Sequence, residues 1–368
     1  MKVMICGGGT GGHVYPALAV VQPLSEHGVT ATDILWVGTH GQMEEQLVPR
    51  AGLRLETVAG GPIAGVPRLA QLKNGAKLTA SIGSAWRMIG RFRPNVLLLT
   101  GGYVNLPVAI AAKLRGVPAA IYLPDVEPGA AIKRIEPLVA KIACTTEGSS
   151  AFLPESKLVV TGYPVRKELR AALAMSQAEA RTQLGLEAER FTLFVFGGSR
   201  GAQSVNQALM AILPELLTEA QVIHVAGTLT WPEVEAFAAT LPADQRARYK
   251  LFPYLHEEMA TAFRSTDLVV ARAGASMLGE CPAFGVPAIL VPYPHAWRYQ
   301  KVNADFLADR GAGIRMNDED MHAHLLPTIR LLMQDSAKLG AMREAAKRLD
   351  VEDAASQIAN VLVQLAKN

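Results

Sequence analysis

Eight short runs of consecutive apolar residues recur along the chain, each followed by a turn and a stretch with helical spacing. They read KVMIC, DILWVG, NVLLLT and AAIYL in the first half, and FTLFVF, QVIHVA, DLVVA and AILVP in the second. Continuous apolar runs, unlike alternating ones, are typical of strands that are covered on both faces. We therefore predict an α/β fold, with parallel sheets joined by crossover helices.

A glycine-rich turn follows one strand in each half of the chain. CGGGTGGH at residues 6–13 and FGGSRGAQ at residues 196–203 both show the order strand, glycine loop, helix start. In doubly wound sheets such loops lie at the carboxyl edge, where ligands bind. The repetition predicts two similar Rossmann-like domains.

The domain boundary is predicted where Gly162 and Pro164 interrupt a strand before a helix. This gives an N-terminal domain over residues 1–162 and a C-terminal domain over 163–350. The remaining segment, 351–368, has the pattern of one amphipathic helix that can pack on either domain.

Composition excludes several classes of protein. Half of the 368 residues are hydrophobic and the net charge is only +3, so we expect no nucleic-acid partner bound through a broad basic face. The three cysteines are widely spaced, which is unlike a disulfide framework or a zinc site. The first apolar run is too short for a signal-peptide core and no run reaches the roughly 18 residues that span a bilayer. We expect a soluble or peripheral cytoplasmic protein.

Four glycine loops are candidates for phosphate binding: Gly7–Gly12, Gly101–Tyr103, Gly197–Gly201 and Gly274–Ser276. The first has the G-x-G-x-x-G spacing of a dinucleotide site. Such a site also needs an acid at the end of the second strand, whereas Asp33 stands at its beginning. Loop amides and helix N-termini can instead hold a diphosphate without a metal, so we expect no metal or other cofactor.

Two side chains near these loops are candidates for chemistry. His13 follows the first glycine loop, and a neutral imidazole there can act as a general base; a cap or a packed ring is the alternative. Glu280 lies one turn into the helix that follows Ser276, where a carboxylate can accept two ribose hydroxyls. The alternative for Glu280 is a solvated acid favoured by the helix dipole.

Several segments, taken in order, resemble the MurG family of bacterial peptidoglycan glycosyltransferases. They span nearly the whole chain and read GGTGGHVYPALAV (8–20), TGGYVNLPVAIAA (100–112), GYPVR (162–166), FGGSRGAQSVN (196–206), ARAGASMLGECPAFGVPAILVPYPH (271–295) and RYQKVNA (298–304).

The resemblance implies a GT-B fold, in which two Rossmann-like domains face a central cleft. It implies an inverting transfer of GlcNAc from UDP-GlcNAc, bound by the C-terminal domain, to the muramyl 4-hydroxyl of lipid I on the N-terminal domain. The product would be lipid II, made at the cytoplasmic face of the cell membrane. The partners implied are UDP-GlcNAc, a polyprenyl-diphosphate-linked muramyl-peptide acceptor and an anionic membrane surface.

The resemblance also assigns roles residue by residue. His13 corresponds to the base or an acceptor-site group, and Met259 in FPYLHEEM would pack on uracil. The acceptor-side candidates are Gly101, Gly102, Tyr103 and Asp125. The donor-binding set is Thr10, Gly11, Gly12, Arg166, Ser199, Met259, Ala275, Ser276, Glu280, Gln300 and Asn303.

The chain departs from the family pattern in two places. YLPDVEPG replaces the H-E-Q-N stretch and puts Asp125 where an asparagine would fall; an ionised aspartate accepts hydrogen bonds but cannot donate them. Tyr299-Gln300 replaces a pair of glutamines. A different acceptor, or Asp125 or Glu127 in the role of the base, therefore stays open.

Other functions stay open as well. A UDP-GlcNAc 2-epimerase would need carboxylates and a histidine clustered at the donor sugar, and the second-half motifs offer no such group. A nucleotide-sugar-binding protein without catalysis is possible if Asp125 has removed the acceptor site. A dehydrogenase is the least favoured alternative.

Three further features are assigned no catalytic or metal-binding role. NDED at 317–320 contains a D-x-D, but its place before a helix favours a cap and an acidic first turn over a metal site. His224, within an apolar strand, is predicted to be structural. His295 lies in the loop before the donor-sugar segment, and we assign it no catalytic role.

Residues 66–93 form a predicted helix that carries basic pairs at i,i+4 spacing, Lys73 with Lys77 and Arg87 with Arg91. Leucines, Ile82, Trp86 and Ile89 lie between them. A basic amphipathic helix can lie on anionic lipid, and the alternative is an ordinary crossover helix with solvated lysines.

Overall fold

The computed structural model describes residues 1–58, 68–198, 200–295 and 298–367, with side chains in the first long helix described from residue 79 onward. The chain divides into two compact units. Unit 1 is Met1–Val165 together with Val351–Asn368, and unit 2 is Arg166–Asp350. The predicted boundary, between residues 162 and 163, lies three residues before this junction.

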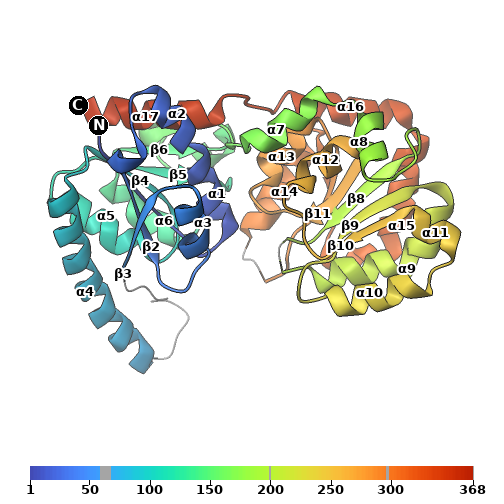
Figure 1. The fold of residues 1–368 in the computed structure, drawn as a ribbon, viewed down its shortest axis with the longest axis horizontal. Coiled ribbons are helices and arrows are strands. Elements are labelled where there is room, and N and C mark those ends of the chain that lie inside the picture. The colour runs from blue at the N-terminus through green and yellow to red at the C-terminus, as the bar shows by residue number, and fades with distance from the viewer. Residues whose placement is uncertain (59–67, 199, 296–297, 368) are drawn as a thin grey trace. The chain divides into compact units, whose positions relative to one another are not determined.

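Unit 1 contains a seven-stranded parallel sheet with the order β3-β2-β1-β4-β5-β6-β7 (Figure 1). Its strands are β1 (Val3–Gly7), β2 (Ile34–Thr39), β3 (Arg54–Val58), β4 (Val96–Gly101), β5 (Ala119–Leu123), β6 (Lys141–Cys144) and β7 (Leu158–Val160). Its helices are α1 (Gly11–Ala19), α2 (Val21–Glu26), α3 (Glu44–Arg50), α4 (Arg68–Phe92), α5 (Asn105–Leu114), α6 (Ala130–Ile135) and α17 (Ala354–Lys367).

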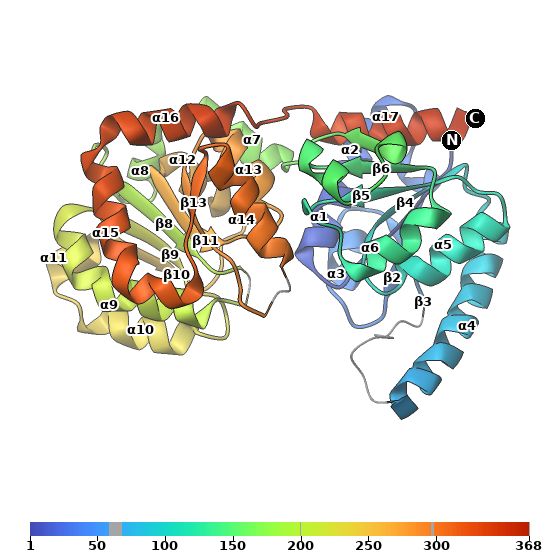
Figure 2. The same ribbon diagram turned by 180° about the vertical axis from the view of Figure 1, so that it is seen from behind.

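Alternate residues of each central strand enter two separate cores. Met4 packs in the core that contains residues of α4 and α5, whereas Val3 and Ile5 pack in the core that contains residues of α1, α2 and α17. Both faces of the sheet are therefore apolar, which explains why the strands read as continuous runs. The C-terminal helix α17 packs on unit 1, beside α2 and the strands (Figure 2).

Unit 2 contains a six-stranded parallel sheet with the order β10-β9-β8-β11-β12-β13. Its strands are β8 (Thr192–Phe196), β9 (Gln221–Val225), β10 (Tyr249–Phe252), β11 (Leu268–Arg272), β12 (Ala288–Val291) and β13 (Gly313–Arg315). Its helices are α7 (Lys167–Ala171), α8 (Gln177–Gln183), α9 (Gln203–Glu219), α10 (Trp231–Thr240), α11 (Ala243–Ala247), α12 (Glu258–Ser265), α13 (Met277–Phe284), α14 (Tyr299–Asp309), α15 (Met321–Gln334) and α16 (Ser336–Lys347).

The first six strands of each unit have the same order, 3-2-1-4-5-6 when counted within the unit. The order reverses between β1 and β4 in unit 1, and between β8 and β11 in unit 2. Ligands of doubly wound sheets bind at the carboxyl ends of the strands at this switch point. The four glycine loops of the sequence follow these four strands, so the topology puts a pair of loops at each switch point.

The helices in the described parts of the chain include none that is long and apolar enough to cross a membrane. The longest, α4, spans 25 residues. In both views the amino-terminal half of α4 extends beyond the other elements of unit 1 (Figures 1 and 2).

Candidate functional site

His13 lies in the first turn of α1, directly after the glycine loop of β1. Its Nδ1 atom is 3.0 Å from the carbonyl oxygen of Gly8 and 3.3 Å from the hydroxyl oxygen of Thr10. A carbonyl oxygen can only accept a hydrogen bond, so Nδ1 carries the proton and Nε2 presents its lone pair. The ring is half-buried, and its free nitrogen is the one suited to accept a proton.

The glycine pair after β4 packs directly against His13. A Cβ atom at Gly101 would lie 2.4 Å from the imidazole Cδ2, and one at Gly102 would lie 2.9 Å from the carbonyl oxygen of Gly8. Both glycines also have positive φ angles, +126° and +96°. The two loops of unit 1 are therefore in contact, and glycine is required at both positions for space and for backbone conformation.

The other predicted residues of unit 1 lie around these loops. Thr10 is the N-cap residue of α1, and Gly11 and Gly12 are its first two helical residues. Tyr103 is 62% exposed, just before α5. Asp125 is half-buried after the end of β5.

Glu127, the alternative base, is buried and lies 3.4 Å from the ammonium of Lys133. Its carboxylate is therefore engaged in an ion pair with a lysine.

In unit 2, three predicted residues come together at the start of α13. Ser276 is the N-cap residue of this helix, and Glu280 lies within its first turns. Burial raises the pKa of the Glu280 carboxyl to about 7, while the nearby charge of Arg166 and a hydrogen bond with Ser276 act in the opposite direction. A carboxylate, a guanidinium and a helix N-terminus thus share one site, which is the donor set suited to a ribose and a phosphate.

Two predicted amides hold the backbone beside this site. Asn303 is 1% exposed, and its Nδ2 donates to the carbonyl oxygen of Ala273 at 3.1 Å. The Oε1 atom of Gln300 accepts from the backbone N–H of Tyr293 at 2.8 Å. Ala275, between Ala273 and the N-cap, is half-buried.

The glycine loop after β8 packs on the end of β9. A Cβ atom at Gly201 would lie 2.3 Å from the carbonyl oxygen of Ala226, and its φ is +86°. Ser199, predicted to face the diphosphate, lies outside the described residues. Met259 is half-buried near the start of α12, which follows the FPYLH loop at the end of β10.

An arginine at the carboxyl end of β11 was missed by the sequence reasoning. Arg272 forms an ion pair with Asp318, donates to the hydroxyl of Ser204 at 2.7 Å and lies 5.4 Å from the ring centroid of Tyr293. Its sequence signal is an arginine directly before the Ala-Gly-Ala-Ser loop. The NDED segment, which includes Asp318, therefore provides an arginine partner, and the described residues contain no group of three or more His, Cys, Asp or Glu able to hold a metal ion.

Two other histidines considered in the sequence, His224 and His295, have different surroundings. His224 is fully buried in β9, with Nδ1 2.7 Å from the hydroxyl of Tyr249 and Nε2 3.0 Å from Oδ1 of Asn206. The prediction that it is structural is confirmed. His295 is exposed and makes an edge contact with the ring of Tyr293.

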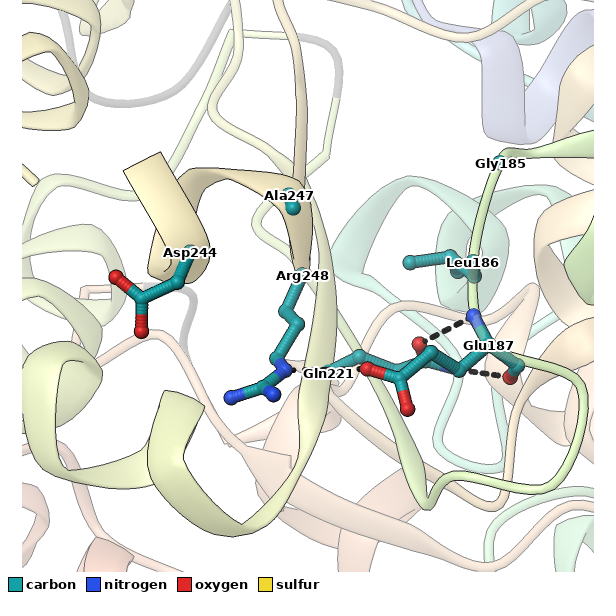
Figure 3. A pocket seen from close by; sticks show the side chains of 7 residues that line it. All are labelled: Gly185, Leu186, Glu187, Gln221, Asp244, Ala247 and Arg248. Atoms are coloured by element: carbon teal, nitrogen blue, oxygen red, sulfur yellow. Dashed lines mark hydrogen bonds and ion pairs between the residues drawn. The ribbon is translucent and has the colours of Figure 1, made fainter. Parts of the chain in front are cut away.

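A pocket of about 440 Å³ lies elsewhere in unit 2, at the amino ends of β9 and β10 (Figure 3). Three of the polar residues that line it, Glu187, Gln221 and Arg248, are paired with one another. Arg248 donates to Glu187 at 3.1 Å, and the Gln221 side chain exchanges two hydrogen bonds with the Glu187 backbone. This pocket is at the edge of the sheet opposite the switch point, so we do not assign the ligand site to it.

Comparison with known proteins identifies the family. Residues 3–143 match the glycosyltransferase family 28 N-terminal domain, and residues 192–358 match the glycosyltransferase family 28 C-terminal domain. Curated relatives from Roseiflexus sp. and Moorella thermoacetica are each 37% identical, over 99% and 100% of this chain and 95% and 100% of their own. Both are named UDP-N-acetylglucosamine–N-acetylmuramyl-(pentapeptide) pyrophosphoryl-undecaprenol N-acetylglucosamine transferase. The chain belongs to this family, the MurG family.

Solved structures agree with the MurG assignment. The crystal structure of Acinetobacter baumannii MurG has a TM-score of 0.76 and 26% identity, and the match covers 99% of both chains. Staphylococcus aureus MnaA in complex with UDP has a TM-score of 0.69 at 14% identity, which shows a shared fold only. The predicted α/β, GT-B fold class of two Rossmann-like domains is confirmed.

Proposed function

We propose that this MurG family member transfers GlcNAc from UDP-GlcNAc to the muramyl 4-hydroxyl of lipid I, which gives lipid II for peptidoglycan synthesis. The observation that carries the proposal is full-length similarity to relatives named for this transfer. The structural support is that each unit has polar groups suited to this chemistry at the switch point of its sheet. One has a histidine with a free Nε2, and the other has a carboxylate, an arginine and a helix N-terminus.

The donor is proposed to bind unit 2. The Glu280 carboxylate accepts the ribose hydroxyls, while Arg166 and the backbone amides at Ala275 and Ser276 bind the diphosphate. The loop that contains Ser199, together with Met259, completes the nucleotide site, and Gln300 and Asn303 face the donor sugar. The Nδ2 group of Asn303 donates one hydrogen to the carbonyl oxygen of Ala273, and a side-chain amide also has a second N–H and an oxygen acceptor with which to meet a sugar hydroxyl.

The acceptor is proposed to bind unit 1. The 4-hydroxyl oxygen attacks the anomeric carbon of GlcNAc, its proton passes to Nε2 of His13, and the bond from that carbon to the β-phosphate oxygen breaks. The electron pair of that bond leaves with UDP. Because the hydroxyl attacks the face opposite the departing UDP in a single displacement, the configuration inverts. Fixed amide dipoles and Arg166 stabilise the negative charge that develops on the diphosphate.

Gly101, Gly102, Tyr103 and Asp125 are proposed to shape the acceptor side of the site. Thr10, Gly11 and Gly12 begin α1, and their amides are oriented to meet a phosphate group that approaches the loop. Because arginine and helix N-termini supply the positive charge that offsets the diphosphate, we propose that transfer needs no metal or other cofactor.

A membrane surface is the last proposed partner. Trp86 in α4 is 39% exposed and the guanidinium of Arg115 lies 4.1 Å from its ring centroid, while Leu114 is 64% exposed. Exposed aromatic and aliphatic groups beside cations are suited to an anionic lipid surface. Arg87 and Arg91 are exposed too, although Arg91 pairs with Glu56, and the side chains of Lys73 and Lys77 lie outside the described residues. We propose that the chain binds the cytoplasmic face of the cell membrane peripherally.

The direct test is transfer of radiolabel from UDP-GlcNAc to a short-chain lipid I analogue, with and without a chelator. We expect a product that contains one GlcNAc, formed at the same rate in both reactions. Absence of transfer would contradict the proposed acceptor, and a reaction that stops on chelation would contradict the metal-free mechanism.

A further inference from the structure

Glu44 is a fully buried carboxylate in unit 1 that the mechanism above does not use. Its Oε2 atom accepts from the backbone N–H of Gly9 at 2.9 Å, and its Oε1 atom accepts from the N–H of Thr39 at 2.8 Å. Gly9 is in the first glycine loop, and Thr39 ends β2. Glu44 is also the first residue of α3, where a helix N-terminus favours negative charge. The carboxylate therefore ties the glycine loop to the neighbouring strand.

Two glycines leave room for this side chain. A Cβ atom at Gly8 would lie 1.9 Å from Oε1 of Glu44, and one at Gly38 would lie 2.6 Å from its Cγ. In a dinucleotide site the corresponding loop packs against a pyrophosphate. Here the N–H of Gly9 already donates to a protein carboxylate, so part of the fingerprint spacing serves Glu44 and not a nucleotide.

The same short loop holds His13. The carbonyl oxygen of Gly8 receives the Nδ1–H of His13, and the N–H of the next residue, Gly9, donates to Glu44. A shift of the Gly8–Gly9 backbone would thus move the acceptor that fixes the imidazole tautomer. The contacts form one chain, from Glu44 through the peptide between these glycines to His13.

We infer that Glu44 is a positioning residue that fixes the Gly8–Gly9 backbone and thereby keeps Nε2 of His13 unprotonated and aimed at the acceptor. The inference deepens the proposed function, because it depends on His13 being the base for the transfer. Because Glu44 is fully buried, its effect on the reaction passes through this backbone and not through contact with a substrate.

The variant Glu44→Gln tests this with little change in volume. Its NH₂ group must face either the N–H of Gly9 or that of Thr39, so one of the two hydrogen bonds is lost and two donors oppose each other. Glu45→Gln is the matched control, since Glu45 is on the same helix and accepts from the N–H of Gly41 at 3.0 Å, outside the His13 loop.

We expect Glu44→Gln to lower kcat about 10- to 100-fold while the KM for UDP-GlcNAc changes less than about 2-fold, as misplacement of a catalytic group does. Glu45→Gln should change both values by less than about 2-fold, because the partners of its carboxylate among the described residues, His40 and Gly41, belong to the 40–45 turn. A Glu44→Gln protein that melts at a lower temperature but keeps wild-type kcat would overturn the inference, because Glu44 would then only stabilise the fold.

The second measurement is independent of transfer. In ¹⁵N NMR spectra of the ring, His13 of the wild type should show the tautomer protonated at Nδ1, and Glu44→Gln should show a mixture with the tautomer protonated at Nε2. An unchanged tautomer in Glu44→Gln would overturn the inference even if the wild type transfers no sugar, so failure of the proposed function and failure of the inference can be told apart. If Glu44→Gln does not fold, Glu44→Asp keeps the charge with a shorter reach, and the same spectra decide.

Discussion

The Nδ1 atom of His13 lies 3.0 Å from the carbonyl oxygen of Gly8, five residues before it in the chain. This contact turns a glycine loop that resembles a dinucleotide fingerprint into the holder of an imidazole. The carbonyl fixes the tautomer and leaves Nε2 available. The position of His13 directly after the last glycine therefore has a geometric reason, since the ring can reach back over its own loop.

Replacing His13 by alanine tests its proposed role as the base. We expect kcat for transfer to fall about 10²- to 10⁴-fold, the usual range for a lost general base. The affinity for UDP, measured by calorimetry, should stay unchanged because the proposed nucleotide site is in unit 2. His27→Ala, which removes an exposed histidine of the same unit, is the control. Unchanged transfer in His13→Ala would move the role of the base to another group, with Asp125 the first candidate.

The raised pKa of Glu280 gives the nucleotide site a pH dependence. Its carboxyl has a pKa of about 7, and we propose that the ionised form accepts the ribose hydroxyls. UDP should therefore bind more tightly as the pH rises from 6 to 8. Glu280→Gln should bind UDP more weakly at pH 8 and lose this dependence. A wild-type affinity that is flat across this range would contradict the assignment.

The raised pKa of Glu280 also affects folding stability. Whereas UDP binding should tighten as the pH rises, the stability contributed by this group should fall. Between the unfolded pKa, near 4.5, and the folded value of about 7, the folded state holds a proton that the unfolded state releases. The contribution of Glu280 is therefore full below pH 4.5 and is lost as the pH rises through 7. Relative to wild type, Glu280→Gln should melt at a higher temperature at pH 8 than at pH 5. No relative gain at pH 8 would indicate an ordinary carboxyl pKa.

His224 should make the folding stability of unit 2 decrease in acid. Burial lowers the pKa of its ring to about 3, whereas the unfolded value is about 6.5, so the folded state favours the neutral ring. The stability that it contributes is present above pH 6.5 and is lost as the pH falls towards 3. At pH 5 the loss from this group is about 2 kcal/mol, from 1.5 pH units at about 1.36 kcal/mol each.

Urea unfolding of wild type and His224→Gln at pH 7 and pH 5 measures this loss. The variant should be less stable than wild type at pH 7, because it disturbs the hydrogen bonds with Tyr249 and Asn206, and the difference should shrink at pH 5. A difference that is equal at both values would mean that the ring is protonated in the folded state as well.

The central strands were predictable from the sequence, and the edge strands were not. All eight apolar runs are strands. The five strands without such a run are the four sheet edges, β3, β7, β10 and β13, and one neighbour of an edge, β6; of these only β7 was expected, as the strand that Gly162 and Pro164 interrupt. Edge strands are short and partly exposed; β3, for example, is buried only at its last residue. They therefore lack the continuous apolar signal that covering on both faces produces.

Some features of the candidate site were also predictable from the sequence, and others were not. The glycine loops were found because positive φ angles and close backbone approaches allow few other residues. Glu44 and Arg272 were missed because their partners are 35 and 46 residues away in the chain. Glutamates are common at helix starts because the helix dipole favours negative charge there. The position of Glu44 in the sequence therefore does not indicate that its side chain is buried and bound to a distant loop.

The close packing of Gly101 on the imidazole predicts the effect of one added methyl group. In Gly101→Ala the new Cβ would lie 2.4 Å from Cδ2 of His13, at a φ of +126° that alanine rarely adopts. We expect a loss of stability of about 1–3 kcal/mol and displacement of the ring, with lower kcat. Gly83→Ala in α4 is the control, because its Cβ would meet nothing within 4 Å. It should stabilise the protein by about 0.5–1 kcal/mol, and a Gly101→Ala variant that matches it in stability and activity would contradict the contact.

The exposed apolar side chains of unit 1 predict which face meets lipid. Leu114→Glu puts a negative charge next in the chain to Arg115, whose guanidinium lies 4.1 Å from the ring centroid of Trp86. It should weaken co-sedimentation with vesicles that contain anionic lipid, because it both removes apolar area and repels the surface. Leu331→Glu is the matched control: Leu331 is 52% exposed, against 64% for Leu114, but it lies in α15 of unit 2.

Binding of the wild type to these vesicles should also fall with added salt, since screening weakens the attraction of cations to the lipid headgroups. Transfer to a water-soluble acceptor analogue should be unaffected in both variants, which separates membrane contact from catalysis. Equal loss of vesicle binding in both would mean that this face of unit 1 has no special role at the membrane.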